Sequence, residues 1–495
     1  MSALLLVPIL APLAAAALAA ALGWRRATAS VTVLAALCVL LTAAFVGFGL
    51  ESGVRFGVAH VLRIDSLGVT MLLVIGTVGT LATWASIGYI DGELARGDTD
   101  RAGAHLYGVL LPLFLAAMSL AVLANNIGVM WVAIEATTVA TAFLVAHSRT
   151  RSALEATWKY VVICSVGIAL ALLGTVLLYF ASLHAGATSS HALDMDTLLS
   201  HAAQLSHAAR LDPDVTLLAA GLLLLGYGAK VGLVPFHTWV ADAQSQAPTP
   251  VSALMSGVLE AVAFCALLRV KHIVDLALGT GFMRTGLLVM GLLTLAVAAS
   301  MLVVQKDFKR MLAYSSMENM GLIAIAAAAG TRLAIAALLL HVLAHGIGKS
   351  LVFLAAGQLQ TAHGSTAIDD VSGVLTRSRL VGISFAVGLA VLVGLPPFAI
   401  FASELSISRA LAGAHLGWVL GAALALMVVA FSALVRSGAR MLFGPPGEGA
   451  PSIAVPRTIA VALCTGVVLS VALGLSAGPL TGLFHAAALQ LGASQ

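Results

Sequence analysis

Long apolar runs separated by short polar loops follow one another along the chain. Read with a window of about 20 residues, each run is long enough for a helix to cross a hydrocarbon core of about 30 Å. The pattern predicts an all-α integral membrane protein with about fourteen transmembrane helices. We place these helices at 1–22, 29–49, 65–90, 107–124, 126–147, 159–183, 214–236, 250–270, 286–304, 312–329, 333–359, 380–405, 411–435 and 458–484.

The composition excludes a soluble protein. Of 495 residues, 60% are hydrophobic and only 9% are charged, whereas a soluble globular chain carries about 25% charged residues. No polar stretch is long enough to fold as a soluble domain, since the longest loops cover 184–213, 360–379 and 436–457. An active site must therefore lie within the membrane or belong to a partner.

Basic side chains gather in the loops of one side if the runs alternate across the bilayer. That side holds most of the loop lysines and arginines, among them Arg25, Arg26, Lys306, Arg436 and Arg440. By the positive-inside rule it is the cytoplasmic side of the cell (inner) membrane, which puts both termini on the non-cytoplasmic side. The net charge of +4 thus reflects topology and predicts no nucleic-acid binding. The first run, with basic residues only after it, is expected to stay as an anchor.

The four cysteines are too scattered to hold a cofactor. They lie singly in different apolar segments, without C-x-x-C spacing, at Cys38, Cys164, Cys265 and Cys464. This removes iron–sulfur ligation, structural zinc and a disulfide framework from consideration. We therefore expect no cofactor and no metal in this chain.

Two of the apolar runs contain helix-breaking residues. Pro235 follows Lys230 by little more than one turn, and the sequence Gly394-Leu-Pro-Pro397 precedes Glu404. A carbonyl freed by proline is tolerated in a membrane where protein or a water-filled cavity satisfies it. Paired interruptions in the two halves of a transporter indicate inverted repeats around an ion path near the midplane. The alternative is a pair of proline kinks that serves packing alone.

Ionisable residues within the apolar runs are few and costly. Each costs at least about 2.5 kcal/mol at the bilayer centre, so each needs a partner, a water cavity or a function. A pair such as Glu135 and Lys230 would form a two-state element that exchanges protons when neighbouring charges move; the alternative is an ion pair that only fixes helix register. Glu318, near a helix start, is expected closer to the interface. The candidate proton-path residues are Glu135, Lys230, Glu260, His341, His345, Lys349 and Glu404.

Three of these candidates share one helical face. His341, His345 and Lys349 recur at every fourth position on a helix otherwise rich in leucine and alanine, so they could form a relay through ordered water. A single histidine there would more often serve packing. Metal binding by the two histidines is disfavoured, because no further carboxylate or cysteine has ligand-like spacing nearby.

One stretch resembles the signature of a known group of membrane proteins. Residues 234–254 read VPFHTWVADAQSQAPTPVSAL, which closely resembles the antiporter-like subunits shared by respiratory complex I, multisubunit Na+/H+ antiporters and membrane-bound group 4 hydrogenases. The stretches DFKRMLAYSS at 307–316, HGIGKSLVFLAAG at 345–357 and GLPPF at 394–398 support this resemblance. It covers nearly the whole chain from about residue 65 to residue 440.

Two further stretches narrow the resemblance. WKYVVICSVG at 158–167 and YSSMENMG at 314–321 look most like the F component of hydrogenase-4, a relative of the formate hydrogenlyase membrane arm. The resemblance implies fourteen helices, with two inverted five-helix repeats and broken helices seven and twelve. Its segments would be the first three helices at 1–106, the first repeat at 107–276, the second repeat at 286–443 and a last helix at 456–495.

The resemblance also assigns roles to single residues. It implies that Glu135 is the fifth-helix glutamate, Lys230 the seventh-helix lysine, Lys349 a lysine of the later channel and Glu404 the twelfth-helix terminal group. Complex I subunits carry a central eighth-helix lysine near the position of Ala261, whereas this chain has Glu260 beside it. Either Glu260 replaces that lysine, or the subunit conducts through fewer groups, or it is mainly structural.

The function that follows is proton translocation by one subunit of a redox-driven complex, of the membrane-bound [NiFe] hydrogenase or formate hydrogenlyase type. Its expected partners are other antiporter-like and small membrane subunits, peripheral [NiFe]-hydrogenase-like and iron–sulfur subunits, and the lipid bilayer. Three alternatives remain open: a subunit of complex I or of a Na+/H+ antiporter, a membrane scaffold that does not conduct, and a partner in inorganic-carbon uptake.

Overall fold

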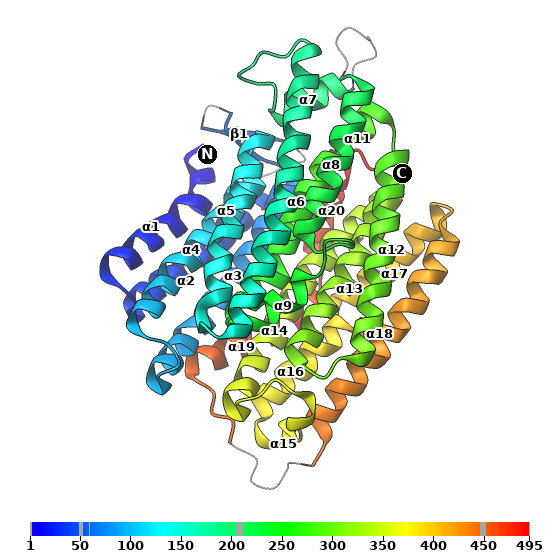
Figure 1. Cartoon of the computed structure of the whole chain (residues 1–495). Helices are drawn as coiled ribbons and strands as arrows, with labels where there is room; N and C mark the ends of the chain where they lie inside the picture. The colour runs from blue at the N-terminus through cyan, green and yellow to red at the C-terminus, as the bar shows by residue number, and fades with distance from the viewer. Residues whose placement is uncertain (1, 49–52, 59, 204–210, 446–451, 495) are drawn as a thin grey trace.

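The helices of the computed structural model follow the expected apolar runs (Figure 1). The structure describes residues 2–48, 53–58, 60–203, 211–445 and 452–494. Residues 1, 49 and 495, which are boundaries of expected segments, lie outside this set. The first half contains α1 (Val7–Leu22), α2 (Arg26–Phe48), α3 (Ser66–Arg96), α4 (Arg101–Leu123), α5 (Ile127–Val145), α6 (Arg151–His184), α7 (Met195–Ala202), α8 (Pro213–Val231), α9 (Trp239–Gln246), α10 (Thr249–Leu254) and α11 (Glu260–Leu278).

The second half continues with the same kind of long helix. It contains α12 (Gly281–Val304), α13 (Phe308–Ala329), α14 (Arg332–His363), α15 (Val374–Arg377), α16 (Arg379–Leu392), α17 (Ala399–Gly413), α18 (Gly417–Phe443), α19 (Arg457–Leu475) and α20 (Gly478–Gln490). The antiparallel strands β1 (Arg55–Gly57) and β2 (Leu62–Ile64) lie in the loop before α3.

Polar residues at the loop ends fix the helix boundaries. The side chains of Asp65, Asp100 and Asn126 accept hydrogen bonds from backbone amides at the starts of α3, α4 and α5, the usual capping arrangement. The Gly103 amide holds the pKa of the Asp100 carboxyl below its usual range. At the other end of α3, Gly97 takes the left-handed conformation that commonly closes a helix.

Among the described residues, twelve helices are long and apolar enough to cross a membrane by themselves. The two remaining expected spans are α13, whose hydropathy is lowered by the polar sequence YSSMEN at 314–319, and the interrupted pair α16 and α17. Together these account for the predicted set of about fourteen spans, so the all-α membrane fold is confirmed.

Both expected interruptions are present. Helix α8 is followed by Gly232 in the left-handed conformation, and the chain passes through Pro235 before α9 begins. Helix α16 ends before Gly394, also left-handed, and α17 begins after Pro397. The predicted breaks in the seventh and twelfth spans are therefore confirmed.

The last expected span differs from the prediction. It was expected as one helix over 458–484, but α19 stops at Leu475 and α20 begins at Gly478. Pro479 lies in the first turn of α20, where it needs no amide hydrogen but cannot continue a preceding helix. The apolar composition of this segment concealed the break.

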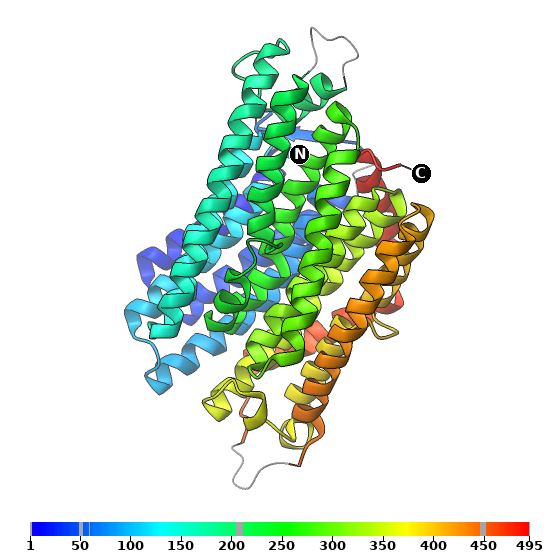
Figure 2. The ribbon, with the colours of Figure 1, turned by 45° about the vertical axis from the view of Figure 1, so that its right-hand side comes forward.

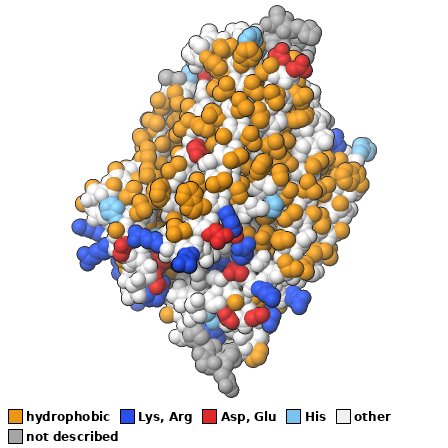
Figure 3. Space-filling model, in the orientation of Figure 1, with side chains coloured by type: hydrophobic (Ala, Val, Ile, Leu, Met, Phe, Trp, Pro, Cys, Tyr) orange, Lys and Arg blue, Asp and Glu red, His pale blue; other side chains and the backbone are white. Residues whose placement is uncertain are grey.

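The helices form one bundle with a buried centre and an apolar surface. Figures 1 and 2 show long helices running side by side, with both ends of the chain toward the same end of the bundle. The segment from α10 through α11 is buried along all of its most apolar window and α14 along 94% of it, whereas α18 is buried along only 22%. Hydrophobic side chains cover most of the face in Figure 3, and charged ones gather toward its lower part. The two central helices carry Glu260 and Lys349.

Candidate functional site

The seven candidate residues lie on helices at or next to the centre of the bundle. The side chains of Lys230, Glu260, His341, His345 and Lys349 are fully buried. Glu135 on α5 and Glu404 on α17 are only half-buried. Lys230, Glu260, His341 and Lys349 make hydrogen bonds, largely to hydroxyl, amide and carbonyl groups, and these contacts form two groups.

The first group surrounds Lys230 at the end of α8. Its Nζ donates to Thr138 Oγ1 at 2.9 Å and to the Tyr160 hydroxyl at 2.6 Å, and it lies 4.8 Å from the centre of the Tyr160 ring. The Thr138 hydroxyl donates in turn to Glu135 Oε2 at 3.1 Å. The structure therefore brings Glu135 and Lys230 together through a bridging hydroxyl; no direct ion pair joins them among the described residues.

The donors and acceptors in the hydrogen bonds around Lys230 can be assigned. Thr141 donates to the Thr137 carbonyl at 2.6 Å, so it accepts from the Tyr160 hydroxyl, 2.6 Å away. Tyr160 accepts from Lys230, which makes the chain a one-way donor sequence from the ammonium group to the α5 backbone. A lysine held by neutral hydroxyls keeps no fixed countercharge, so its proton affinity depends on the carboxylate beyond Thr138.

The second group is centred on Glu260 and α13. A π-helical turn, Met255–Leu259, directly precedes Glu260; such turns occur frequently at functional sites. Gln244 Nε2 donates to Glu260 Oε1 at 2.6 Å, and Gln244 Oε1 accepts from Ser316 at 3.2 Å. Oε2 of Glu260 has no hydrogen-bond partner within the described part of the chain. The break after α8 positions α9, and α9 supplies the glutamine that holds this carboxylate.

Lys349 lies beside the same carboxylate and a second one. Its Nζ donates to the Leu312 carbonyl at 2.6 Å and to Ser315 Oγ at 2.5 Å. It interacts electrostatically with Glu260 and with Glu318. As with Lys230, polar but uncharged groups make the direct contacts, and the carboxylates act over a longer distance.

The position predicted for Glu318 from the sequence is wrong. It was expected near the interface, yet it is buried in the middle of α13, and its Oε2 has no hydrogen-bond partner in the described residues. Its charge interacts with those of Lys349 and Glu404. The signal that could have located it is the polar run around it, which is unusual inside a membrane helix.

The orientation of His341 is fixed by α13. Asn319 Nδ2 donates to the Ser315 carbonyl, which leaves Asn319 Oδ1 as an acceptor for His341 Nε2 at 2.7 Å. His341 Nδ1 faces Ser403 Oγ at 2.9 Å, and this hydroxyl also lies 2.7 Å from the Ile400 carbonyl. The serine can donate to the neutral ring, or turn to the carbonyl and accept from the charged ring, so His341 can gain a proton without backbone movement.

His345 is placed differently from its neighbour. Its ring lies nearly parallel to that of His341 with 6.4 Å between ring centres. Neither of its nitrogens meets the geometric criteria for a hydrogen bond among the described residues, although the Ser256 backbone interacts with the ring. The three candidates on α14 are thus all buried, and His345 is the one with the weakest hydrogen-bonding contacts.

The second interruption makes room for Glu404. Gly394 lies against its carboxylate, and a Cβ atom at position 394 would overlap Oε2 and Cδ of Glu404. Glu404 also lines a cavity of about 200 Å³ together with Leu322, Phe401 and Ser408. The broken helix therefore places a half-buried carboxylate at the end of the second group.

A variant at this glycine tests that role. Gly394→Ala is expected to lower the free energy of unfolding by about 1–3 kcal/mol, because alanine is strained at its φ of +65° and meets the Glu404 carboxylate. Thermal unfolding of the purified chain in detergent measures the change. Gly413→Ala is the control, since nothing lies within 4 Å of its Cβ position; equal unfolding temperatures for both variants would contradict the assignment.

A polar cavity approaches the second group from the basic end of the bundle. Its volume is about 720 Å³, and Glu93, His147, Lys309 and Gln360 are among the residues that line it. Lys309 is buried and donates to the Ala247 carbonyl at 2.9 Å. The cavity reaches α13 and α14, which carry Lys349 and its partners.

The arrangement can be compared with known proteins. Residues 124–430, which include all seven candidates, match the family described as NADH:quinone oxidoreductase/Mrp antiporter, transmembrane. The chain belongs to this family. Its resemblance to antiporter-like subunits is thereby confirmed, and it is an antiporter-like membrane subunit that crosses the bilayer many times.

A hydrogenase-4 relative agrees with the narrower resemblance. The chain is 37% identical over 394 residues to a hydrogenase-4 component F homolog of Methylacidiphilum infernorum, covering 78% of this chain and 80% of the relative. It is 32% identical over 395 residues to NADH-quinone oxidoreductase subunit N of Rhodococcus opacus, covering 78% and 70%. A chain of the archaeal membrane-bound sulfane sulfur reductase superposes with a TM-score of 0.86 at 25% identity, covering 99% and 98%.

Proposed function

We propose that this chain carries protons across the cell membrane as one subunit of a redox-driven complex of the membrane-bound [NiFe] hydrogenase or formate hydrogenlyase type. The observation that carries the proposal is that two fully buried lysines, Lys230 and Lys349, are held by uncharged groups with carboxylates close by but not bonded to them. The similarity to a hydrogenase-4 component F homolog supports the choice of complex.

In the proposed mechanism, Glu135 sets the charge state of Lys230. While the carboxylate is ionised and bonded to Thr138, Lys230 keeps its proton. When electron transfer in a partner neutralises or displaces Glu135, Lys230 releases the proton, and Glu260 or Lys349 receives it. No hydrogen bond links the two groups among the described residues, so this step needs water or a side-chain movement.

The path would have one opening at each end of the second group. The polar cavity beside Lys309 would admit protons from the cytoplasmic side, and Glu404 with its cavity would release them on the far side. His341 would hold a proton between these ends, since its serine partner can turn. One proton crosses from one opening to the other each time both groups return to their starting protonation states.

We also propose an orientation of the chain in the membrane and the subunits that surround it. Both termini would lie on the non-cytoplasmic side, because basic loops face the cytoplasm. The chain would consist of two inverted five-helix repeats, 107–276 and 286–443. Other antiporter-like and small membrane subunits would flank it, and peripheral [NiFe]-hydrogenase-like and iron–sulfur subunits would supply the redox reaction. A complex of the NADH-quinone oxidoreductase kind is the second candidate, favoured by the similarity to its subunit N.

Removal of the bridging hydroxyl tests the proposal. Thr138→Val keeps the shape of the side chain but removes one hydrogen bond to each of Glu135 and Lys230. We therefore expect redox-driven proton uptake by vesicles to fall at least about tenfold, the factor for losing one hydrogen bond to a charged group. Thr138→Ser retains the hydroxyl and should keep most of the uptake. Equal uptake by both variants would show that the bridge has no part in conduction.

A further inference from the structure

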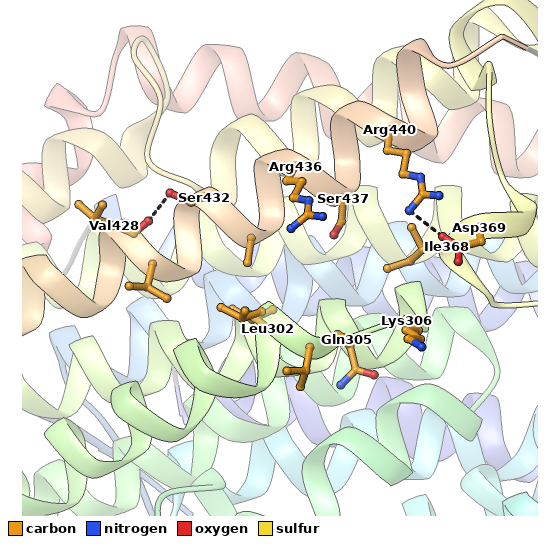
Figure 4. Close-up of a pocket in the computed structure, with 14 residues that line it drawn as sticks. Leu302, Gln305, Lys306, Ile368, Asp369, Val428, Ser432, Arg436, Ser437 and Arg440 are labelled. Atoms are coloured by element: carbon orange, nitrogen blue, oxygen red, sulfur yellow. Dashed lines mark hydrogen bonds and ion pairs between the residues drawn. The ribbon is translucent and has the colours of Figure 1, made fainter.

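A groove lies between α12 and α18, away from both groups of candidate residues. Its volume is about 640 Å³, and its walls come from the end of α12, the segment around Asp369 and one face of α18 (Figure 4). The helix α18 is mostly exposed along its length. The groove therefore opens toward the surroundings of the bundle.

The face of α18 that lines the groove changes from apolar to basic along its length. Val428 and Val429 come first, followed by Ser432, Arg436 and Arg440. Val428 and Arg440 are twelve positions apart, which corresponds to about 18 Å along a helix. On the opposite wall, apolar residues of α12 give way to Lys306 at the same end. The groove has an apolar half and a cationic half.

The cationic half carries more positive charge than its own residues neutralise. Arg440 pairs with Asp369 at 2.7 Å, the dashed contact in Figure 4. Lys306 and Arg436 form no ion pair within the described part of the chain, and Figure 4 shows Arg436 extending from α18 toward α12. The groove therefore has an excess of two positive charges at one end of its apolar half.

We propose that this groove binds an anionic phospholipid. The phosphate of its headgroup would lie between Lys306 and Arg436, with Ser437 as a further donor, and an acyl chain would lie along Val428, Val429 and the end of α12. Basic pockets between transmembrane helices bind acidic headgroups in this way. A helix of a partner protein would fit only if it carried acidic side chains at the cationic end, whereas a phospholipid combines an anionic head and an apolar chain at this spacing.

Native mass spectrometry of the purified full-length chain tests the proposal. The probes are phosphatidylglycerol and phosphatidylcholine with identical acyl chains. We expect preferential retention of phosphatidylglycerol, with about fivefold lower occupancy for Lys306→Gln or Arg436→Gln and a larger loss for both together. Arg151→Gln, an exposed charge at the start of α6, is the control and should retain the wild-type occupancy. Equal retention of the two lipids, or no effect of either variant, would overturn the proposal.

A second measurement identifies the occupant in membranes. A photo-crosslinking amino acid at Val429 should form an adduct with the mass of a phospholipid. An adduct with a protein subunit instead would show that the groove is a protein contact and would overturn the proposal. Because all substituted side chains are exposed, the unfolding temperature of each variant should match that of the wild type.

Discussion

Replacing Lys349 with methionine will reduce redox-driven proton uptake at least about tenfold while the bundle remains folded, because a positioned proton-transfer group commonly contributes about a hundredfold or more to the rate. Methionine has nearly the length of lysine, so it preserves the packing of a fully buried position on α14. It removes the positive charge that lies near both Glu260 and Glu318. Without the lysine, neither carboxylate can receive a proton from it or return one to it. The second group then has lost its proton carrier.

The control for this variant is a lysine on the surface. Lys159 pairs with Glu155 and Asp242 at a half-exposed site on α6, so Lys159→Met removes the same side chain without touching the buried groups. Proton uptake by vesicles that contain the intact complex, normalised to electron transfer, measures both variants. Wild-type uptake by Lys349→Met would exclude the second group from the path.

Replacing Arg269 with methionine will lower the free energy of unfolding by about 3–5 kcal/mol, the usual cost of breaking a buried ion pair. Arg269 on α11 donates to both oxygens of Asp65, at 3.0 and 3.2 Å, and to the Val122 carbonyl. Asp65 also accepts from Arg63 at 3.2 Å and caps α3. The variant would leave a buried carboxylate with only part of its compensation.

A double variant and the pH dependence sharpen this test. Asp65→Asn combined with Arg269→Met should be more stable than Arg269→Met alone, since the poorly compensated carboxylate is gone and the amide oxygen that replaces it can still accept from Arg63. Burial would raise the pKa of Asp65, but Arg269 and Arg63 outweigh it and hold that pKa below its usual range. The wild-type advantage should therefore be complete above about pH 4 and disappear as the pH falls through the lower folded value. Thermal unfolding in detergent measures each difference, and an advantage that persists under acid conditions would contradict the assignment.

Much of the fold follows from the sequence because the bilayer imposes simple rules. Apolar length predicts a span, and Pro235 and Pro397 predicted the two breaks because proline removes a backbone donor. The break between Leu475 and Gly478 was missed, since small apolar residues surround Pro479 and no ionisable group marks it. The division into inverted repeats stays a prediction.

Only some residues of the candidate site could be predicted from the sequence. An ionisable residue in an apolar run is easy to recognise because its insertion into the membrane costs free energy, and this is how Lys230 and Glu260 were identified. Threonine and serine cost little within a membrane helix, so nothing distinguished Thr138 from its neighbours until the fold placed it between Glu135 and Lys230. Partners of this kind depend on which helices pack together.

The most direct test of the central claim is redox-driven proton uptake by vesicles that contain the intact complex, comparing the wild type with Lys230→Ala and Glu135→Gln after assembly has been verified. Proton conduction through this chain predicts that both variants lose uptake while electron transfer is retained or slowed. Unchanged uptake in both would contradict it and would make the chain a scaffold whose complex moves protons through a neighbouring subunit.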